Sequence, residues 1–276
     1  MDNDSVFSGK FNYDFLQTHH TLVQLKVLEL AFARFVWKGR NSYSFNRCFL
    51  ILKGEGLICN HTGSQRLTMS AGNGYFMPPG IDLSFDFPPG LELLSIHFNA
   101  FLLPGMDVFA KETQCLEFPV GTARLEEFRL LLERADGWGA LCRFESILWE
   151  LLSRINLPGM DHFGSVPVLQ KRYGLLLQYI HDNISARTGI GELSAVAGMG
   201  SDTLSRRFSR DFGIPLKTFL MKELISVAER HLLGGDLSIR EIAQKLEFSS
   251  EYYFSSFFKR MKGISPTIFR SMRGKL

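Results

Sequence analysis

Two short segments near the C-terminus carry polar and basic side chains at helical spacing. Asp202, Ser205 and Arg206 share one side of a helix, and Tyr252 and Lys259 do so fifty residues later. Guanidinium and hydroxyl groups on an exposed helix face can hydrogen-bond to base edges and phosphates, and arginine can make a bidentate contact to guanine. We therefore predict a DNA-reading surface. Its candidate residues are Asp202, Thr203, Ser205, Arg206, Arg207, Ser209, Arg210, Glu251, Tyr252, Ser255, Ser256 and Lys259.

The two segments belong to a repeated unit that spans 193–219 and 242–269. Phe208 and Gly213 recur as Phe258 and Gly263 at an offset of fifty residues. Each copy predicts a short helix, a tight turn and a second helix, with Ser201 and Ser249 as the caps of the second helices. One such copy could be an ordinary solvated helix pair, but two copies in register favour a two-part DNA reader.

The segment between the copies predicts a bridging helix over about 215–233. At 1.5 Å per residue it would be ~28 Å long, and successive major-groove faces lie ~34 Å apart on one side of DNA. Arg260 and Lys262 flank the second candidate face, and we expect them to contact the phosphate backbone. Charge agrees, because 169–276 holds 17 Lys/Arg and 10 Asp/Glu (+7), whereas the remainder holds 14 and 18 (−4).

The second copy resembles the AraC-type transcription regulators. The positions that carry this resemblance are Ile242, Ala243, Phe248, Ser249, Tyr253, Phe254, Phe258, Lys259, Gly263, Ser265, Pro266 and Arg270. The resemblance implies two helix-turn-helix units that contact promoter DNA and RNA polymerase, usually as an activator. Two positions depart from the pattern, because Glu247 stands at a turn where glycine is frequent and Ser256 where a base-reading arginine is frequent. We therefore expect the first copy, with Arg206, to dominate base reading.

The N-terminal half predicts β-structure, because short apolar runs alternate with Gly- and Pro-rich turns. It resembles the cupin-like jelly-roll sensing domain of the same family. Cupin enzymes hold a metal with a cluster of His and Glu residues, but Leu83 occupies one ligand position and His61 stands alone. We therefore expect no catalytic residue, no metal, no cofactor and no enzymatic activity; a cupin-type enzyme with a DNA-binding domain is the less favoured alternative.

A small-molecule effector is expected in the mouth of this barrel, with a sugar as one candidate. Each candidate residue also has a simpler reading: Arg34 as an edge residue that reaches solvent, Trp37 as a packing residue and His97 as a core residue. The candidates are Arg34, Trp37, Phe85, Leu93, Ser95 and His97. A regulator that needs no ligand remains the alternative.

Two amphipathic helices are predicted within 124–155, either to dimerise the chain or only to cover the barrel.

The full prediction is a multidomain α+β protein. Residues 1–156 form a cupin-like ligand-sensing and dimerisation domain, 157–168 a linker and 169–276 an all-α domain of two helix-turn-helix units. No signal segment or membrane span is evident, and four scattered cysteines fit a reducing compartment, so a cytoplasmic location is expected. The chain is also expected to form a homodimer.

Overall fold

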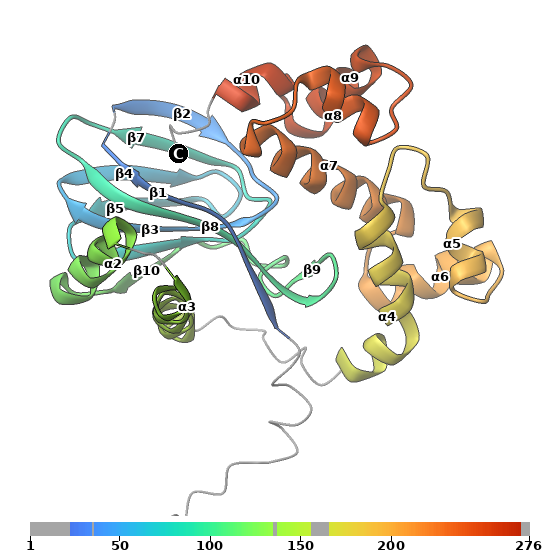
Figure 1. The fold of residues 1–276 in the computed structure, drawn as a ribbon, viewed down its shortest axis with the longest axis horizontal. Coiled ribbons are helices and arrows are strands. Elements are labelled where there is room, and N and C mark those ends of the chain that lie inside the picture. The colour runs from blue at the N-terminus through green and yellow to red at the C-terminus, as the bar shows by residue number, and fades with distance from the viewer. Residues whose placement is uncertain (1–22, 35, 135–136, 156–165, 272–276) are drawn as a thin grey trace, which may run out of the picture.

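The computed structural model describes residues 23–34, 36–134, 137–155 and 166–271. The first part of this chain forms two antiparallel sheets (Figure 1). The larger sheet has the order β1-β8-β3-β6-β10, with β9 paired to β8. Its strands are β1 (Gln24–Ala33), β3 (Asn46–Lys53), β6 (Asn73–Met77), β8 (Glu92–Leu103), β9 (Met106–Asp107) and β10 (Leu116–Pro119).

The smaller sheet has the order β2-β7-β4-β5. Its strands are β2 (Trp37–Asn41), β4 (Glu55–Asn60), β5 (Gln65–Ser70) and β7 (Leu83–Phe87). Leu83, Phe85 and Phe87 alternate inward along β7 and share a buried cluster with Phe49 and Leu93 of the larger sheet. The expected double-sheet β domain is therefore confirmed, with its core between the two sheets.

Two helices, α2 (Thr122–Arg134) and α3 (Gly137–Ser153), pack on the opposite face of the larger sheet. Phe128, Phe144 and Leu148 share one buried cluster with Leu94 and Ile96 of β8. The larger sheet is thus covered on both faces, which explains the nearly continuous apolar runs in β3 and β8.

The second part of the chain is helical. Its elements are α4 (Val166–Asn183), α5 (Ile190–Val196), α6 (Ser201–Phe212), α7 (Leu216–Gly234), α8 (Ile239–Lys245), α9 (Glu251–Lys262) and α10 (Pro266–Ser271). Helix α4 begins within the segment proposed as a linker, and residues 157–165 of that segment lie outside the described residues. Helix α7 connects the α5–α6 pair to the α8–α9 pair (Figure 1).

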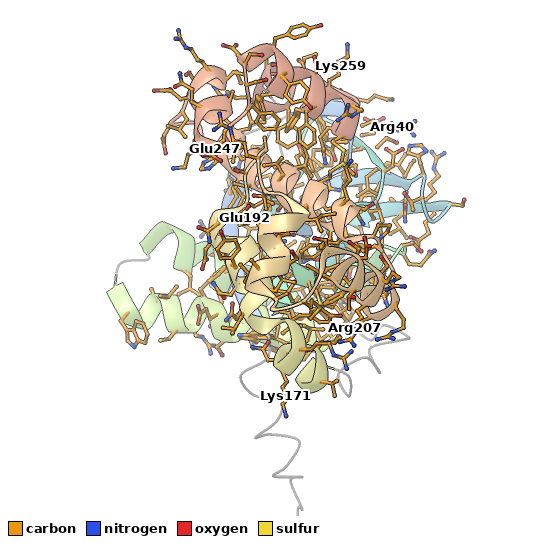
Figure 2. The ribbon with its side chains drawn as sticks, turned by 90° about the vertical axis from the view of Figure 1, so that its right-hand side faces the viewer. Arg40, Lys171, Glu192, Arg207, Glu247 and Lys259 are labelled. Carbon is orange, nitrogen blue, oxygen red and sulfur yellow. The ribbon has the colours of Figure 1, made fainter. Side chains whose placement is uncertain are left out.

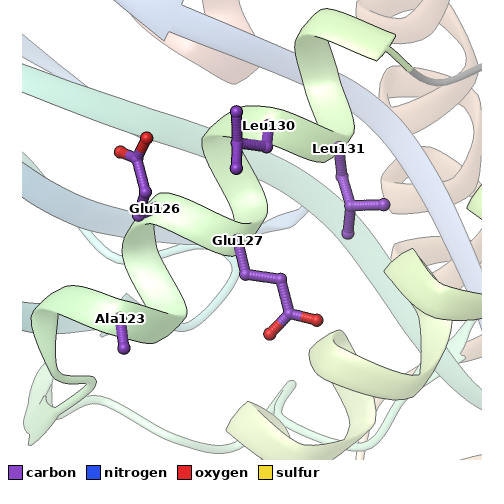
Figure 3. A pocket seen from close by; sticks show the side chains of 5 residues that line it. All are labelled: Ala123, Glu126, Glu127, Leu130 and Leu131. Atoms are coloured by element: carbon purple, nitrogen blue, oxygen red, sulfur yellow. The ribbon is translucent and has the colours of Figure 1, made fainter.

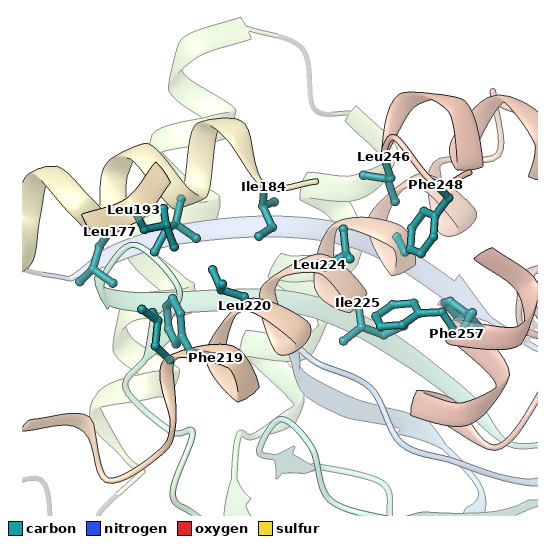
Figure 4. Close-up of a cluster of buried hydrophobic side chains, with 14 of the residues drawn as sticks. Leu177, Ile184, Leu193, Phe219, Leu220, Leu224, Ile225, Leu246, Phe248 and Phe257 are labelled. Atoms are coloured by element: carbon teal, nitrogen blue, oxygen red, sulfur yellow. The ribbon is translucent and has the colours of Figure 1, made fainter. Parts of the chain in front are cut away.

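The core of the helical domain runs along α7. Phe219 and Leu220 contact the first helix pair, whereas Phe257 belongs to the second (Figure 4). The same cluster includes Tyr43 and Phe45 of the β domain. The two domains therefore share one continuous hydrophobic contact. No helix among the described residues is long and apolar enough to cross a membrane.

Candidate nucleic-acid interface

Helix α6 presents one apolar and one polar face. Leu204 and Phe208 are buried, and Phe212 is half-buried. The polar residues predicted from the sequence point away from this core: Asp202, Arg206, Arg207 and Arg210 are exposed, and Thr203, Ser205 and Ser209 are half-buried. Gly213 ends the helix in the left-handed conformation, with φ of 72°.

Helix α9 repeats this arrangement fifty residues later. Phe254, Phe257 and Phe258 are buried, and Gly263 ends the helix with φ of 77°. Of the candidate residues, Ser255 is half-buried and four are exposed: Glu251, Tyr252, Ser256 and Lys259. The Tyr252 side chain is 82% exposed, although an aromatic ring usually gains stability from burial. Both helices therefore combine an anchored apolar face with an accessible polar one.

The predicted caps of both helices are wrong by one residue. Gly200, in extended conformation, precedes α6, and Ser201 lies inside the helix, where its hydroxyl donates to Ser194 Oγ at 3.2 Å. At α9 the cap is Ser250, whose Oγ accepts a hydrogen bond from the Tyr253 N–H at 3.1 Å. At α9 the adjacent Ser249 and Ser250 suit the cap equally well by sequence, and only the backbone geometry distinguishes them.

Three cations of these faces carry charges that no described residue pairs with. Arg206, Arg207 and Lys259 make no hydrogen bond or ion pair with any other residue that the structure describes. Arg207 and Lys259 lie toward opposite ends of the helical domain, on the side that faces the viewer in Figure 2. Arg210 differs, because its Nε lies 3.0 Å from Asp211 Oδ1. Unpaired cations on an exposed helix face are available to a polyanion.

Lys262 is not part of this surface, which corrects the sequence prediction. Its side chain is only 8% exposed and forms an ion pair with Glu229, which is fully buried. The ammonium group also lies over the rings of Tyr43 and Phe269, at 5.8 and 6.0 Å from their centroids. Lys262 therefore belongs to the contact between the two domains.

The two turns share an unusual backbone conformation. In the first copy Gly198 has φ of 61°, and in the second Glu247 occupies the corresponding place with φ of 55°. Only glycine adopts this left-handed region without steric cost. The departure noted in the sequence is therefore a change of residue without a change of turn.

The candidate ligand residues separate into two places. Leu93, Ser95 and His97 of β8 and Phe85 of β7 are buried between the sheets. Trp37 is half-buried and packs on Phe85 and Phe87, with ring centroids 5.6 Å apart in each case.

Arg34 does not join this group. Its side chain is 63% exposed, its Nη2 lies 3.3 Å from Glu92 Oε2, and its guanidinium covers Phe32. Phe32 pairs with Leu94, which belongs to the outer cluster under α2 and α3, so this strand face points away from the barrel interior. The register shift between Val27 and Glu29 lies before this stretch, so Phe32 and Arg34 keep one face of the strand.

His97 has both ring nitrogens engaged. Nε2 lies 3.0 Å from Ser95 Oγ, and Nδ1 lies 3.0 Å from Glu29 Oε2. Burial lowers the pKa of His97, and the hydrogen bond to Glu29 opposes that shift.

The arginine that sequence reasoning missed is Arg47. It lies at the start of β3, after Asn46 and directly before the apolar run that begins at Cys48, is 1% exposed and lies opposite His97 in the sheet register. An arginine directly before an apolar strand run is the one sequence signal that points to it.

A second surface feature lies on the outer helices. Ala123, Glu126, Glu127, Leu130 and Leu131 of α2 line an open hollow of about 430 Å³ (Figure 3). Trp138, Leu141 and Trp149 of α3 are also exposed, by 78%, 49% and 41%. Exposed aromatic and apolar side chains in this number often mark an interaction site.

Comparison with known proteins agrees with this geometry. A family model described as a helix-turn-helix domain matches residues 193–272. The chain is 30% identical over 95 residues to the HTH-type transcriptional activator AarP of Providencia stuartii. This match covers 34% of this chain and 70% of AarP. The chain belongs to the AraC family of transcription regulators. The resemblance stated from the second repeat is thereby confirmed.

Other members of the AraC family match more of the chain. It is 26% identical over 155 residues to the virulence regulon transcriptional activator VirF of Yersinia enterocolitica, and the match covers 54% of this chain and 55% of VirF. The chain thus spans about half the length of such relatives. The structure of ToxT from Vibrio cholerae matches with a TM-score of 0.52 at 12% identity, covering 93% of this chain and 97% of ToxT. This likeness concerns the fold, and it extends over both domains.

Proposed function

We propose that this AraC-family chain binds promoter DNA through α6 and α9 and regulates transcription, with activation as the expected direction. The observation that carries this proposal is the matched pair of anchored helices with exposed Arg206, Arg207 and Lys259 that have no partner among the described residues. Arg206 is assigned to base contact, and Arg207 and Lys259 to phosphate contact. AarP and VirF are named as transcriptional activators, which supports a contact with RNA polymerase.

Selection of bound sequences from a random DNA pool tests this function. We expect enrichment of a site with two unequal halves, read by α6 and α9. Arg206→Ala should lose the enriched positions of one half. If the wild-type chain enriches no sequence at an ionic strength near that of the cell, sequence-specific binding is refuted.

We further propose that the β domain binds a small-molecule effector between its sheets, near Trp37, Phe85, Leu93, Ser95 and His97. Arg34 is not retained in this set because of its exposed ion pair. A sugar was the candidate from sequence, but Trp37 is engaged with Phe85 and Phe87, which leaves its ring less free to stack on one. The ToxT structure contains an unsaturated fatty acid, so ligand selection should include acids as well as sugars.

A homodimer through α2 and α3 completes the proposal. The exposed Trp138, Leu141 and Trp149 give the surface an apolar centre, and the Arg124–Glu127 and Arg143–Glu127 ion pairs give it a charged border. Sedimentation of the wild type and of Trp149→Glu tests it: the variant should sediment as a monomer at concentrations where the wild type is dimeric. Equal sedimentation would refute this interface.

A further inference from the structure

Arg47 is a buried cation that pairs with no anion among the residues the structure describes. It is 1% exposed, and the ion pairs formed by described residues do not include it. Burial lowers the pKa of Arg47, to about 10, and the nearby Tyr43, Cys115 and Glu229 side chains offset only part of that shift. Burying an uncompensated charge is costly, so such a residue is retained where it serves a purpose other than stability.

The neighbouring amide adds a second donor that lacks an acceptor. Arg47 Nη1 donates to Asn41 Oδ1 at 2.6 Å, which fixes the orientation of the Asn41 side chain. Asn41 Nδ2 and Arg47 Nε are both buried and have no hydrogen-bond partner. Two N–H donors and a positive charge therefore share one place that supplies too few acceptors.

The surroundings of this place are aromatic. The Arg47 guanidinium lies 5.0 Å from the Tyr43 ring centroid and 5.3 Å from that of Phe85, and Phe85 in turn contacts Phe49 at 5.7 Å. His97 does not supply the acceptor, because both of its nitrogens are engaged with Ser95 and Glu29. A ligand that satisfies this site needs an anionic oxygen pair attached to an apolar body.

We propose that the β domain binds an organic acid with an apolar body, whose carboxylate accepts hydrogen bonds from Arg47 Nε and Asn41 Nδ2. Planar carboxylates match the donor geometry of arginine, and such charged hydrogen bonds are the strong ones. This inference rests on the proposed effector binding and names the class of effector.

The site lies directly beneath the contact with the helical domain. Tyr43 covers Arg47 and lies 5.0 Å from Phe269 of α10, measured between ring centroids. The next residue, Ser44, donates its backbone N–H to Glu229 of α7. Tyr43 is fully buried, so an acid that enters here must displace the segment that holds the two domains together. Occupancy of the barrel would in this way alter the placement of α7.

Thermal unfolding of the full-length chain with matched ligand pairs tests the proposal. The probes are octanoate against octan-1-ol and benzoate against benzyl alcohol, which differ in the carboxylate but little in the apolar body. We expect at least one acid at ~100 times its dissociation constant to raise the melting temperature by several degrees, and its alcohol to do so much less. Titration calorimetry then gives the dissociation constants.

The variants assign the effect to this site. Arg47→Met should weaken binding of the acid about tenfold to hundredfold. Arg66→Met removes the same charge from an exposed position of β5 and should bind the acid as the wild type does. Asn41→Ala removes one donor and should also weaken binding; it carries the test if Arg47→Met does not fold.

Three results would overturn the inference: no tested acid stabilises the wild type, acid and alcohol stabilise it equally, or both Arg47→Met and Asn41→Ala bind the acid like the wild type. Its failure is distinct from failure of the proposed function. A chain that selects specific DNA and responds to a neutral ligand keeps the proposed function and refutes only the carboxylate. A wild-type chain that selects no DNA sequence refutes the proposed function whatever it binds in the barrel.

Discussion

The carboxylate of Glu229 accepts a hydrogen bond from the backbone N–H of Ser44 at 2.9 Å. Helix α7 of the helical domain is thereby joined to the segment between β2 and β3 of the β domain. Glu229 is fully buried and also pairs with Lys262 of α9. One carboxylate thus connects the barrel, the bridging helix α7 and helix α9.

Breaking this ion pair should destabilise the protein. Lys262→Met leaves the Glu229 charge buried without its counterion, which should cost about 3 kcal/mol of unfolding free energy in urea. Glu229→Gln should cost a similar amount, and the double variant less than the two single costs combined. Lys259→Met, on the exposed face of the same helix, is the control and should change stability by less than ~0.5 kcal/mol. A Lys262→Met cost no larger than the control would contradict the assigned role.

The two reading helices should contribute unequally to specificity. Arg206→Ala removes the arginine available for guanine and should reduce discrimination against a mismatched site by about 1–3 kcal/mol. Ser256→Ala removes only a hydroxyl and should cost less. Competition between selected and random DNA measures both, with Arg187→Ala, exposed but outside both helices, as the control. Equal losses for Arg206→Ala and Ser256→Ala would refute the inequality.

The turn at Glu247 offers a stabilising substitution. Glu247→Gly should relieve the left-handed strain, and after the entropy lost by introducing glycine the gain should be roughly 0.5 kcal/mol. Gly198→Ala, at the same place in the first copy, should instead destabilise by about 1 kcal/mol. Thermal unfolding of both variants compares the two turns. Destabilisation by Glu247→Gly would show that the side chain makes a contribution larger than the strain.

Glu223 should make stability depend on pH. It lies at the domain contact, where a Cβ on Gly105 would come within 2.7 Å of its Cδ. Burial raises the pKa of Glu223 to about 7 from an ordinary 4.5, and Arg230 opposes the shift. The folded state therefore binds the proton more tightly than the unfolded state, and this group's contribution to stability falls as pH rises between these two values.

The size of that effect is about 3 kcal/mol for a shift of this kind. Glu223→Gln cannot ionise, so it should be more stable than the wild type at about pH 8 and similar to it at about pH 5. Urea unfolding at both pH values measures the difference. Glu55→Gln, at an exposed site, is the control and should show no such pH-dependent gain. A Glu223→Gln variant with the same pH profile as the wild type would contradict the prediction.

The helical domain was predicted well because its signals are local and occur twice. Phe208 and Phe258 mark the same buried position in each copy, and their spacing alone locates the polar face. What the spacing does not resolve is a single residue of register, as Ser201 and Ser250 show at the caps.

The barrel was predicted less well because its contacts join distant strands. Arg34 shares a strand face with Phe32, and Phe32 pairs with Leu94 of the outer cluster, so this face lies outside the barrel; the sequence does not show which face of a strand is inside. By sequence Lys262 falls beside the candidate DNA surface. Its partner Glu229 lies in another helix, and the local pattern does not reveal this pairing. Long-range pairing decides which of several charged residues is buried, and a local pattern does not contain that information.

Helix α7 has 19 residues and contains no proline. Each residue inserted in such a helix would rotate everything that follows by about 100° and advance it by about 1.5 Å. One extra residue would therefore turn α9 away from the direction that α6 faces, whereas a whole additional turn would nearly restore its direction. In the proposed mode of DNA binding, the distance between the two DNA segments is consequently set in units of helical turns, and a change by a single base pair would not fit.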